Sequence, residues 1–321
     1  MLKVAVLCGG YSHEKEVSFE SVKTILKHLN PEKYATTKII VDDSGWYHQN
    51  GNERTDIDKN DFSLTINNER ITFDFAYIIV HGTPGEDGKL QAYFDMLHIP
   101  YNTCGHTAST ITFDKWACNS LLKQFGIHCA KSQLVRKGAT FSSEKIIQEL
   151  HLPCFVKPND GGSSFGTTKV KEAKSLAPAI NSAFDHGKEV IIESCLNGIE
   201  VTCGCYKDQD DIIVLPATEI VTENDFFDYE AKYLGKSQEI TPARIPAETY
   251  TKIIETNKFI YQLLGLNGIV RIDYMIQGEI PFVIEINTTP GMSAASIIPQ
   301  QAHEAGVAIS DLLDSIISNS M

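Results

Sequence analysis

The chain has 321 residues, which is enough for two or three domains with substantial hydrophobic cores. Its formal net charge of −13 argues against nucleic acid or an anionic membrane surface as the main partner, because both are bound through a basic face. No apolar stretch has the length of a membrane span, the N-terminal apolar run is too short for a signal peptide, and the eight cysteines form no CxxC pair, so we expect a reduced, cytoplasmic protein.

Strands and helices alternate through the first hundred residues. Apolar runs at 2–8, 36–42 and 75–82 predict three strands. Apolar residues at helical spacing predict a helix that ends at Asn30-Pro31, and these are Val22, Ile25, Leu26 and Leu29. Because strands that alternate with helices favour a parallel sheet, residues 1–103 are predicted to form a parallel α/β domain.

Two further parts follow. Residues 104–192 contain a helical segment and then several strands, which predicts a small central α+β domain. Residues 193–321 are expected to form a third domain of strands, a loop rich in acidic and aromatic residues, a helix, a hairpin and a C-terminal helix. The predicted fold class is therefore α/β and α+β in three domains.

The central part contains the glycine-rich segment FVKPNDGGSSFGTTKV at 155–170. Its glycines at 161, 162 and 166 would let backbone N–H groups approach an anion, and Lys157 at the end of the preceding strand would add a positive charge. An ordinary hairpin loop would explain the glycines alone about as well. Walker A and dinucleotide-binding loops are disfavoured, because no GK[ST] ends the segment and no GxGxxG follows the first strand.

A hairpin is predicted near the C-terminus, from VRIDYM at 270–275 and VIEIN at 283–287. Because side chains alternate along a strand, Arg271 and Asp273 share one face, and Glu285 and Asn287 share one face of the partner strand. If both polar sets face the same way, the register places Asp273 near Glu285 and Arg271 near Asn287. The opposite face of the second strand is expected to be apolar through Ile284 and Ile286.

Two carboxylates and one amide on a single patch suit Mg²⁺, which prefers oxygen ligands and substrate phosphates. Burying a carboxylate without a cation costs on the order of several kcal/mol. A surface network of ion pairs around Arg271 is the alternative, and it would be favoured for any one of these residues alone. The combination of Asp273, Glu285 and Asn287 indicates a metal site.

Seven short motifs follow one another along the chain. They are GGYSHEKEVS (9–18), HGTPGEDG (81–88), DKW (114–116), KPNDGGSS (157–164), YEAKY (229–233), RID (271–273) and EINTTPGMSAASI (285–297). Together they resemble the D-alanine:D-alanine ligase family, whose members have the ATP-grasp fold, along almost the whole chain.

The resemblance implies that ATP binds between the central and C-terminal domains. The implied nucleotide contacts are those of Lys115, Lys157, Glu193, Leu196 and Glu200. The implied ligands of two Mg²⁺ ions, with Mn²⁺ as an alternative, are Asp273, Glu285 and Asn287. Ser194 and Cys195 follow Glu193 where some relatives carry a basic residue, so the adenine contacts are less firmly implied than the metal site.

The implied reaction joins two molecules of D-alanine through an acyl phosphate, for peptidoglycan precursor synthesis. The residues implied for catalysis are Glu14, Ser163, Tyr233, Arg271 and Gly291. Those implied for substrate binding are His81, Lys232, Ser296 and Ile297. Arg271 and the backbone near Gly291 would stabilise the oxyanion, and a tyrosine at 233 favours an amine over D-lactate as the second substrate.

Three alternatives remain open at the level of sequence. Another ATP-grasp carboxylate-amine ligase would keep the lysines and metal ligands, but it need not keep Glu14, Tyr233 and Ser296. A regulator that had lost catalysis would be expected to lack a metal ligand or Arg271, and neither is missing. An interaction protein without activity gives no reason for the lysines and the metal patch to occur together. The resemblance also implies a homodimer.

Overall fold

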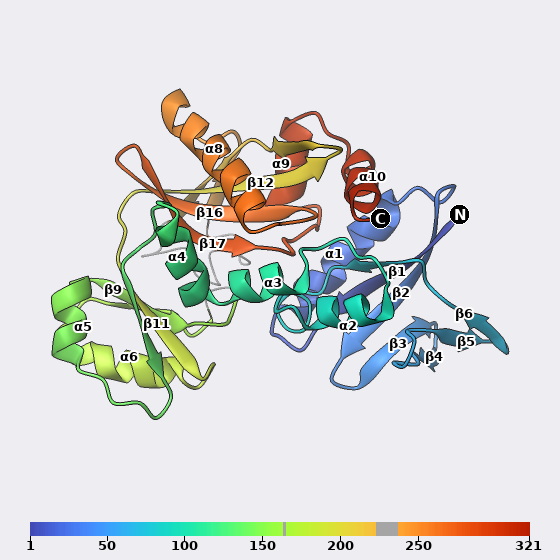
Figure 1. Ribbon diagram of the computed structural model, residues 1–321, viewed down its shortest axis with the longest axis horizontal. Coiled ribbons are helices and arrows are strands. Elements are labelled where there is room, and N and C mark those ends of the chain that lie inside the picture. The colour runs from blue at the N-terminus through green and yellow to red at the C-terminus, as the bar shows by residue number, and fades with distance from the viewer. Residues whose placement is uncertain (163–164, 223–236) are drawn as a thin grey trace.

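The computed structural model describes residues 1–162, 165–222 and 237–321, which are built around three main sheets (Figure 1). None of the helices in these ranges combines the length and hydrophobicity of a membrane-spanning segment. The mixed α/β and α+β architecture agrees with the predicted fold class.

The N-terminal part forms a five-stranded sheet in the order β4-β3-β2-β1-β7. Strand β1 pairs in parallel with β2 and β7, as predicted. The sheet then continues in antiparallel through β3 and β4, and β5 and β6 form a separate hairpin. These additions were missed because their short strands are half-exposed and lack a clear apolar alternation. The elements are β1 (Leu2–Gly9), α1 (Lys15–His28), β2 (Tyr34–Asp42), β3 (Gly45–Asn50), β4 (Glu53–Asp56), β5 (Leu64–Ile66), β6 (Glu69–Ile71), β7 (Phe75–Ile78) and α2 (Lys89–Leu97).

The central part forms a four-stranded antiparallel sheet in the order β10-β9-β11-β8, which lies at the lower left of Figure 1. Helices α5 and α6 bury their apolar residues against this sheet. The elements are α3 (His106–Phe113), α4 (Lys115–Gln124), β8 (Ser132–Arg136), α5 (Ser143–Leu150), β9 (Cys154–Pro158), β10 (Thr168–Val170), the 3₁₀ turn η1 (Ala173–Ser175), α6 (Leu176–Ala183) and β11 (Glu189–Ser194).

The C-terminal part forms a six-stranded antiparallel sheet in which β15-β14-β12-β16-β17 are consecutive and β13 pairs with β12. Helix α8 packs on this sheet. The elements are β12 (Ile199–Asp208), β13 (Asp211–Val214), β14 (Thr218–Thr222), β15 (Ser237–Ile240), α8 (Ala247–Leu263), β16 (Val270–Gln277), β17 (Ile280–Asn287), α9 (Ile297–Glu304) and α10 (Ile309–Asn319).

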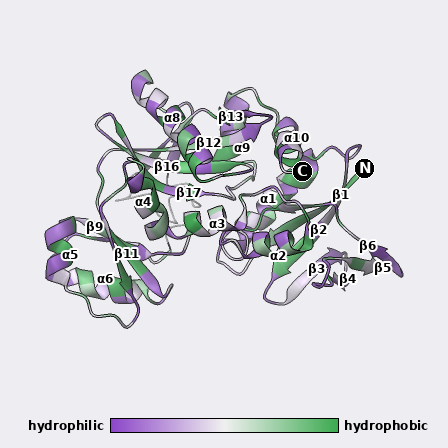
Figure 2. Ribbon diagram, in the orientation of Figure 1, coloured by the Kyte–Doolittle hydropathy of each residue, from purple (hydrophilic) through white to green (hydrophobic). Residues whose placement is uncertain are grey.

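The two ends of the chain share a hydrophobic core. Leu312 and Ile316 of α10 pack in one buried cluster with Val6 of β1 and Ile25 of α1, and Figure 1 shows α10 beside α1. Figure 2 shows hydrophobic residues along the strands, while the helices carry hydrophobic and hydrophilic stripes. The last helix therefore attaches the C-terminal sheet to the N-terminal one by burial of apolar surface.

The predicted hairpin is formed by β16 and β17 with the expected register. Asp273 pairs with Glu285 and Arg271 pairs with Asn287. The prediction that Ile284 lies on the apolar face is wrong, because the register shifts between Asp273 and Tyr274. Such a bulge opposes two residues on one strand to one on the other. Ile284 is therefore turned to the cavity described below.

Candidate active site

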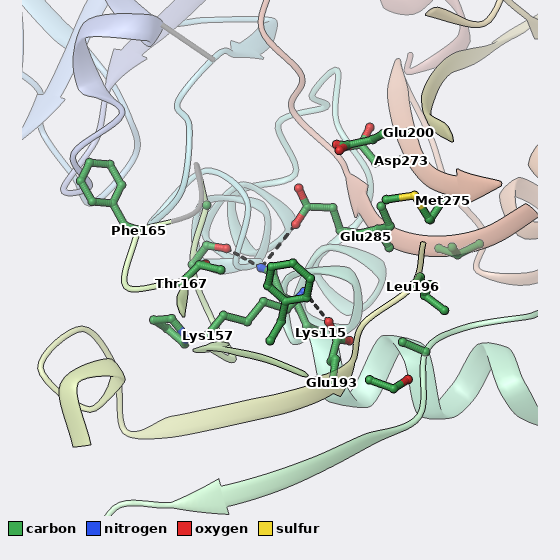
Figure 3. Close-up of a pocket in the computed structure, with 18 residues that line it drawn as sticks. Lys115, Lys157, Phe165, Thr167, Glu193, Leu196, Glu200, Asp273, Met275 and Glu285 are labelled. Atoms are coloured by element: carbon green, nitrogen blue, oxygen red, sulfur yellow. Dashed lines mark hydrogen bonds and ion pairs between the residues drawn. The ribbon is translucent and has the colours of Figure 1, made fainter. Parts of the chain in front are cut away.

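A cavity lies between the four-stranded and six-stranded sheets (Figure 3). Strands β9 and β11 place Lys157 and Glu193 in its wall, β16 and β17 place Asp273 and Glu285 there, and Lys115 enters from the first residue of α4. Mostly apolar walls with a few convergent charged groups are typical of small-molecule sites.

The two lysines of this cavity are held by carboxylates. Lys157 Nζ lies 2.6 Å from Glu193 Oε2, and Glu193 Oε1 accepts a hydrogen bond of 3.0 Å from Asn119 Nδ2. Burial alone would lower the pKa of Lys157, but Glu193 and Glu285 outweigh it and raise this pKa above its ordinary value. Lys115 Nζ donates to the Gly161 carbonyl and lies 3.7 Å from Glu285 Oε2. Lys157 therefore keeps its charge in a buried position, where an anionic ligand could use it.

Asp273 is the centre of the polar patch on the hairpin. Arg271 binds it through both carboxylate oxygens, with Nε 2.8 Å from Oδ1 and Nη2 2.9 Å from Oδ2. Thr202 Oγ1 donates to Oδ1, and Asn287 Nδ2 donates to Oδ2 over 3.1 Å. These bonds fix both the carboxylate and the guanidinium in one orientation.

The patch fits Mg²⁺ by the chemistry of its donors. Asp273 and Glu285 supply carboxylates, and the Asn287 side chain supplies an amide oxygen, which are ligands that this ion accepts together with phosphate oxygens. Among the described residues there is no group of three or more His, Cys, Asp or Glu side chains that could hold a metal. Two carboxylates and an amide therefore fit an ion that also needs ligands from its substrate.

A second cavity adjoins the first, and Gly162 and Glu285 line both. Six of the residues predicted for catalysis or substrate binding line this second cavity: Glu14, His81, Arg271, Gly291, Ser296 and Ile297. They come from the start of α1, the segment after β7, strand β16, and the turn between β17 and α9. The fold thus collects side chains that lie almost 300 residues apart in sequence.

His81 has a protein partner for each ring nitrogen. Its Nδ1 lies 2.8 Å from the Thr289 carbonyl, so this nitrogen carries the hydrogen, and Nε2 lies 3.4 Å from Ser21 Oγ. Ser21 Oγ accepts the Met292 N–H over 3.1 Å and is left to donate to Nε2. Burial lowers the pKa of His81 despite the nearby Glu14 carboxylate, so the ring is neutral near pH 7. His81 and Ser21 therefore hold both ends of the turn that contains Gly291.

Glu14 lies against the glycine-rich loop. A Cβ built on Gly162 would come within 3.0 Å of the Glu14 carboxyl carbon, so a side chain at this position would displace the Glu14 carboxylate. The half-buried Glu86 is a neighbour that sequence reasoning missed, although it stands in the motif HGTPGEDG. Its Oε2 accepts the Gly82 N–H over 2.8 Å. Loss of solvation, together with the Glu14 charge, raises the pKa of Glu86 to about 8.

Comparison with known families agrees with this geometry. The family described as "D-ala D-ala ligase N-terminus" matches residues 3–104, and "D-ala D-ala ligase C-terminus" matches residues 121–318. The chain belongs to the D-alanine–D-alanine ligase family. The predicted family is thereby confirmed.

Relatives extend over the whole length of this ligase-family chain. It is 48% identical over 318 residues to the D-alanine–D-alanine ligase of Bacteroides fragilis, which covers 98% of each chain. Among solved structures, the VanG D-Ala:D-Ser ligase of Enterococcus faecalis has a TM-score of 0.87 at 32% identity and covers 100% of this chain and 99% of its own. The ATP complex of the Bacillus anthracis D-alanine–D-alanine ligase has a TM-score of 0.80 at 28% identity, over 100% and 97% of the two chains. The predicted ATP-grasp fold is confirmed by these likenesses.

The structure brings most of the predicted site residues of this ligase-family chain to one of the two cavities. The first is lined by the five residues predicted to contact the nucleotide and by two predicted metal ligands: Lys115, Lys157, Glu193, Leu196, Glu200, Asp273 and Glu285. Asn287 lines the second cavity. Ser163, Lys232 and Tyr233 lie outside the described residues. The functional role of each residue stays a prediction.

Proposed function

We propose that this chain joins two molecules of D-alanine into D-alanyl-D-alanine at the expense of ATP, for peptidoglycan precursor synthesis. The observation that carries the proposal is the contact between the two cavities, which share Gly162 and Glu285. A nucleotide in the first cavity would thus direct its terminal phosphate toward an amino acid in the second. Membership of the ligase family and the names of the relatives support the same reaction.

The first step would activate a carboxylate. An oxygen of the first D-alanine attacks the γ-phosphorus, ADP leaves, and an acyl phosphate forms. Lys115 and Lys157 would bind the phosphates, and Glu14 would bind the ammonium group of this substrate. Adenine and ribose would be held by Glu193, Leu196 and Glu200.

In the second step the amine of the second D-alanine attacks the acyl carbon, and phosphate leaves. The Arg271 guanidinium, which Asp273 orients through two hydrogen bonds, and the backbone N–H near Gly291 would stabilise the oxyanion of the tetrahedral intermediate. Ser296 and the backbone of Ile297 would bind the carboxylate of the second substrate. His81 would lie near the carboxylate of the first substrate. Its hydrogen bond to the Thr289 carbonyl also holds the turn that contains Gly291.

Mg²⁺, or Mn²⁺ in its place, would be held by Asp273, Glu285 and Asn287. When bound, it would neutralise phosphate oxygens and so lower the barrier to phosphoryl transfer. This part of the proposal rests on the donor chemistry of the three side chains.

Roles proposed for residues outside the described ranges rest on the family resemblance alone. Ser163 and Tyr233 would form a hydrogen-bond network with Glu14, and Lys232 would help to bind the second substrate. A homodimer and a cytoplasmic location are proposed too, the latter because all eight cysteines are free thiols.

The domain boundaries also belong to the proposal. The five-stranded sheet falls within residues 1–103, and the six-stranded sheet falls within residues 193–321. Strand β11 runs from Glu189 to Ser194 and so crosses the boundary predicted between 192 and 193. A boundary in the short segment between β11 and β12 would keep each sheet whole.

One assay tests the reaction. Purified protein with ATP and Mg²⁺ is expected to release ADP when D-alanine is added, and mass spectrometry is expected to detect D-alanyl-D-alanine. D-Serine, D-lactate and L-alanine are tested alongside, because a solved relative is a D-Ala:D-Ser ligase. Lys157→Ala should lose most activity, whereas Lys145→Ala, on the exposed face of α5, should not.

Absence of ADP release with all four compounds would refute the substrate assignment. ADP release that requires D-alanine but yields a mixed dipeptide when D-serine is also present would shift the proposal to a ligase of broader second-substrate specificity.

A further inference from the structure

Asn159 is a buried side chain whose polar groups are all used. It follows the last residue of β9 and is only 1% exposed. Its Nδ2 donates to Asp114 Oδ1 over 2.8 Å and to Glu189 Oε2 over 3.3 Å. Its Oδ1 accepts the Trp116 N–H over 2.9 Å, and its backbone N–H donates to the Glu189 carbonyl over 2.9 Å. A buried amide with so complete a set of partners has a defined position.

These bonds organise the first turn of α4. The first N–H groups of a helix have no partner within the helix and must find one elsewhere. Here the Lys115 N–H donates to the Asn159 carbonyl over 3.2 Å, and the Trp116 N–H donates to its side chain. The Ala117 N–H donates to Asp114 Oδ1 over 2.8 Å, and Asn159 holds that same oxygen. Asn159 thus contributes, directly or through Asp114, to all three bonds.

Lys115 is the residue that this arrangement fixes in space. It is the first residue of α4, and its Nζ reaches the Gly161 carbonyl and comes within 3.7 Å of Glu285, in the cavity proposed for the nucleotide. Asn159 stands between Lys157 and Gly161 in the chain, so it joins the glycine-rich loop to the helix that bears the second lysine. Asn159 itself is not among the residues that line the cavity.

We propose that Asn159 is a positioning residue for nucleotide binding, because it holds Lys115 at the phosphate end of the cavity by tying the first turn of α4 to the glycine-rich loop. This inference rests on the proposed use of ATP. Pre-organised groups bind a ligand more tightly than groups that must be ordered on binding. Without the Asn159 side chain, the Trp116 N–H loses its hydrogen-bond acceptor. Asp114, which caps the N-terminus of α4, loses the hydrogen bond that Asn159 donates to it.

The test is direct binding of the non-hydrolysable ATP analogue AMP-PNP with Mg²⁺, measured by isothermal titration calorimetry. Asn159→Ala is expected to weaken binding about tenfold, equivalent to about 1.4 kcal/mol. Asn257→Ala is the matched control, since Asn257 is also buried and donates to a backbone carbonyl, but lies on α8 away from the cavity. It should lose stability and keep the affinity of the unmodified protein.

A double-mutant cycle shows whether Asn159 acts through Lys115. In the Lys115→Ala background, Asn159→Ala should cause no further loss of affinity. An additive loss would mean that Asn159 acts independently of the lysine and would overturn the inference.

A second variant covers the case in which Asn159→Ala does not fold. Asn159→Asp keeps the acceptor for Trp116 but places a carboxylate beside Asp114 and Glu189, so it should also weaken AMP-PNP binding. If neither variant folds, Asn159 is structural and the inference is wrong. If the unmodified protein does not bind AMP-PNP, the proposed function fails instead; if it binds and the variants bind equally well, only the inference about Asn159 fails.

Discussion

At the scale of single residues, the contact between Gly162 and Glu14 makes a sharp prediction. A methyl group on Gly162 would overlap the Glu14 carboxylate, whereas the same group on Gly161 would meet only Pro158 Cβ, at 3.8 Å. Gly162→Ala should therefore displace the Glu14 carboxylate from the ammonium group that it is proposed to bind, and lower kcat/KM for D-alanine about tenfold, because a hydrogen bond to a charged group contributes about 1.5–3 kcal/mol. Steady-state kinetics at saturating ATP measure the effect.

Gly161→Ala is the control for that experiment. It adds the same group to the same proposed phosphate loop without displacing Glu14, since 3.8 Å is an ordinary van der Waals distance, so at saturating ATP it should lower kcat/KM for D-alanine less than Gly162→Ala does. Equal effects of the two substitutions would mean that the loop tolerates no side chain at all, and the specific contact with Glu14 would not explain the result.

The raised pKa of Glu86 predicts that the stability of the folded protein depends on pH. Loss of solvation and the neighbouring Glu14 raise the pKa of Glu86 from 4.5 to about 8 in the folded protein. As pH rises above 4.5, the unfolded chain loses this proton while the folded protein keeps it, so the free energy of unfolding falls until about pH 8.

Glu86→Gln removes this titration and keeps an acceptor for the Gly82 N–H. The variant should gain in melting temperature relative to the unmodified protein at pH 8 but not at pH 5, measured by calorimetry without ligands. An equal difference at both pH values would contradict the raised pKa.

At the scale of elements, the structure was predictable from the sequence where the polar–apolar alternation of a strand matches the burial of its two faces. The β16–β17 register was predictable because alternation has a period of two, and a shift by one residue would turn Asp273 and Glu285 to opposite faces. The bulge after Asp273 was not predictable, since Val283 and Ile284 are both apolar and the sequence does not show which of them faces the core, and Ile284 was misplaced for this reason. The hairpin strands β3 to β6 were missed because short, half-exposed strands give little hydrophobic signal.

The candidate site also combines features that were predictable from the sequence with features that were not. Motifs located the chemistry-bearing residues, and the fold brings those within the described part of the chain to two adjoining cavities. No local pattern could show that His81 bonds to Thr289, 208 residues away, or that Ser21 completes the link to Met292. Such contacts depend on how α1, the segment after β7 and the turn after β17 pack together. Supporting residues such as Ser21 and Asn159 are therefore visible only in three dimensions.

At the scale of the whole molecule, the proposed nucleotide site lies between two sheets. Lys157 and Glu193 belong to the four-stranded sheet, whereas Asp273 and Glu285 belong to the six-stranded one. A ligand that contacts both sheets should stabilise their arrangement, because binding to the folded state alone raises the free energy of unfolding. At a ligand concentration of 100 times Kd, the gain is about 2.7 kcal/mol.

ATP with Mg²⁺ should therefore raise the melting temperature by several degrees, and EDTA should reverse part of that rise. Glu285→Gln should keep the rise produced by ATP alone and lose the increment that Mg²⁺ adds, because it removes one of the two carboxylates that would hold the ion. Glu279→Gln, in the exposed turn of the same hairpin, changes the net charge equally and should keep the full increment. If Glu285→Gln retained the Mg²⁺ increment while Asp273 and Asn287 were unchanged, Glu285 would not be a ligand of the ion. Its role would then be restricted to the ion pair with Lys115, in which Lys115 Nζ lies 3.7 Å from Glu285 Oε2.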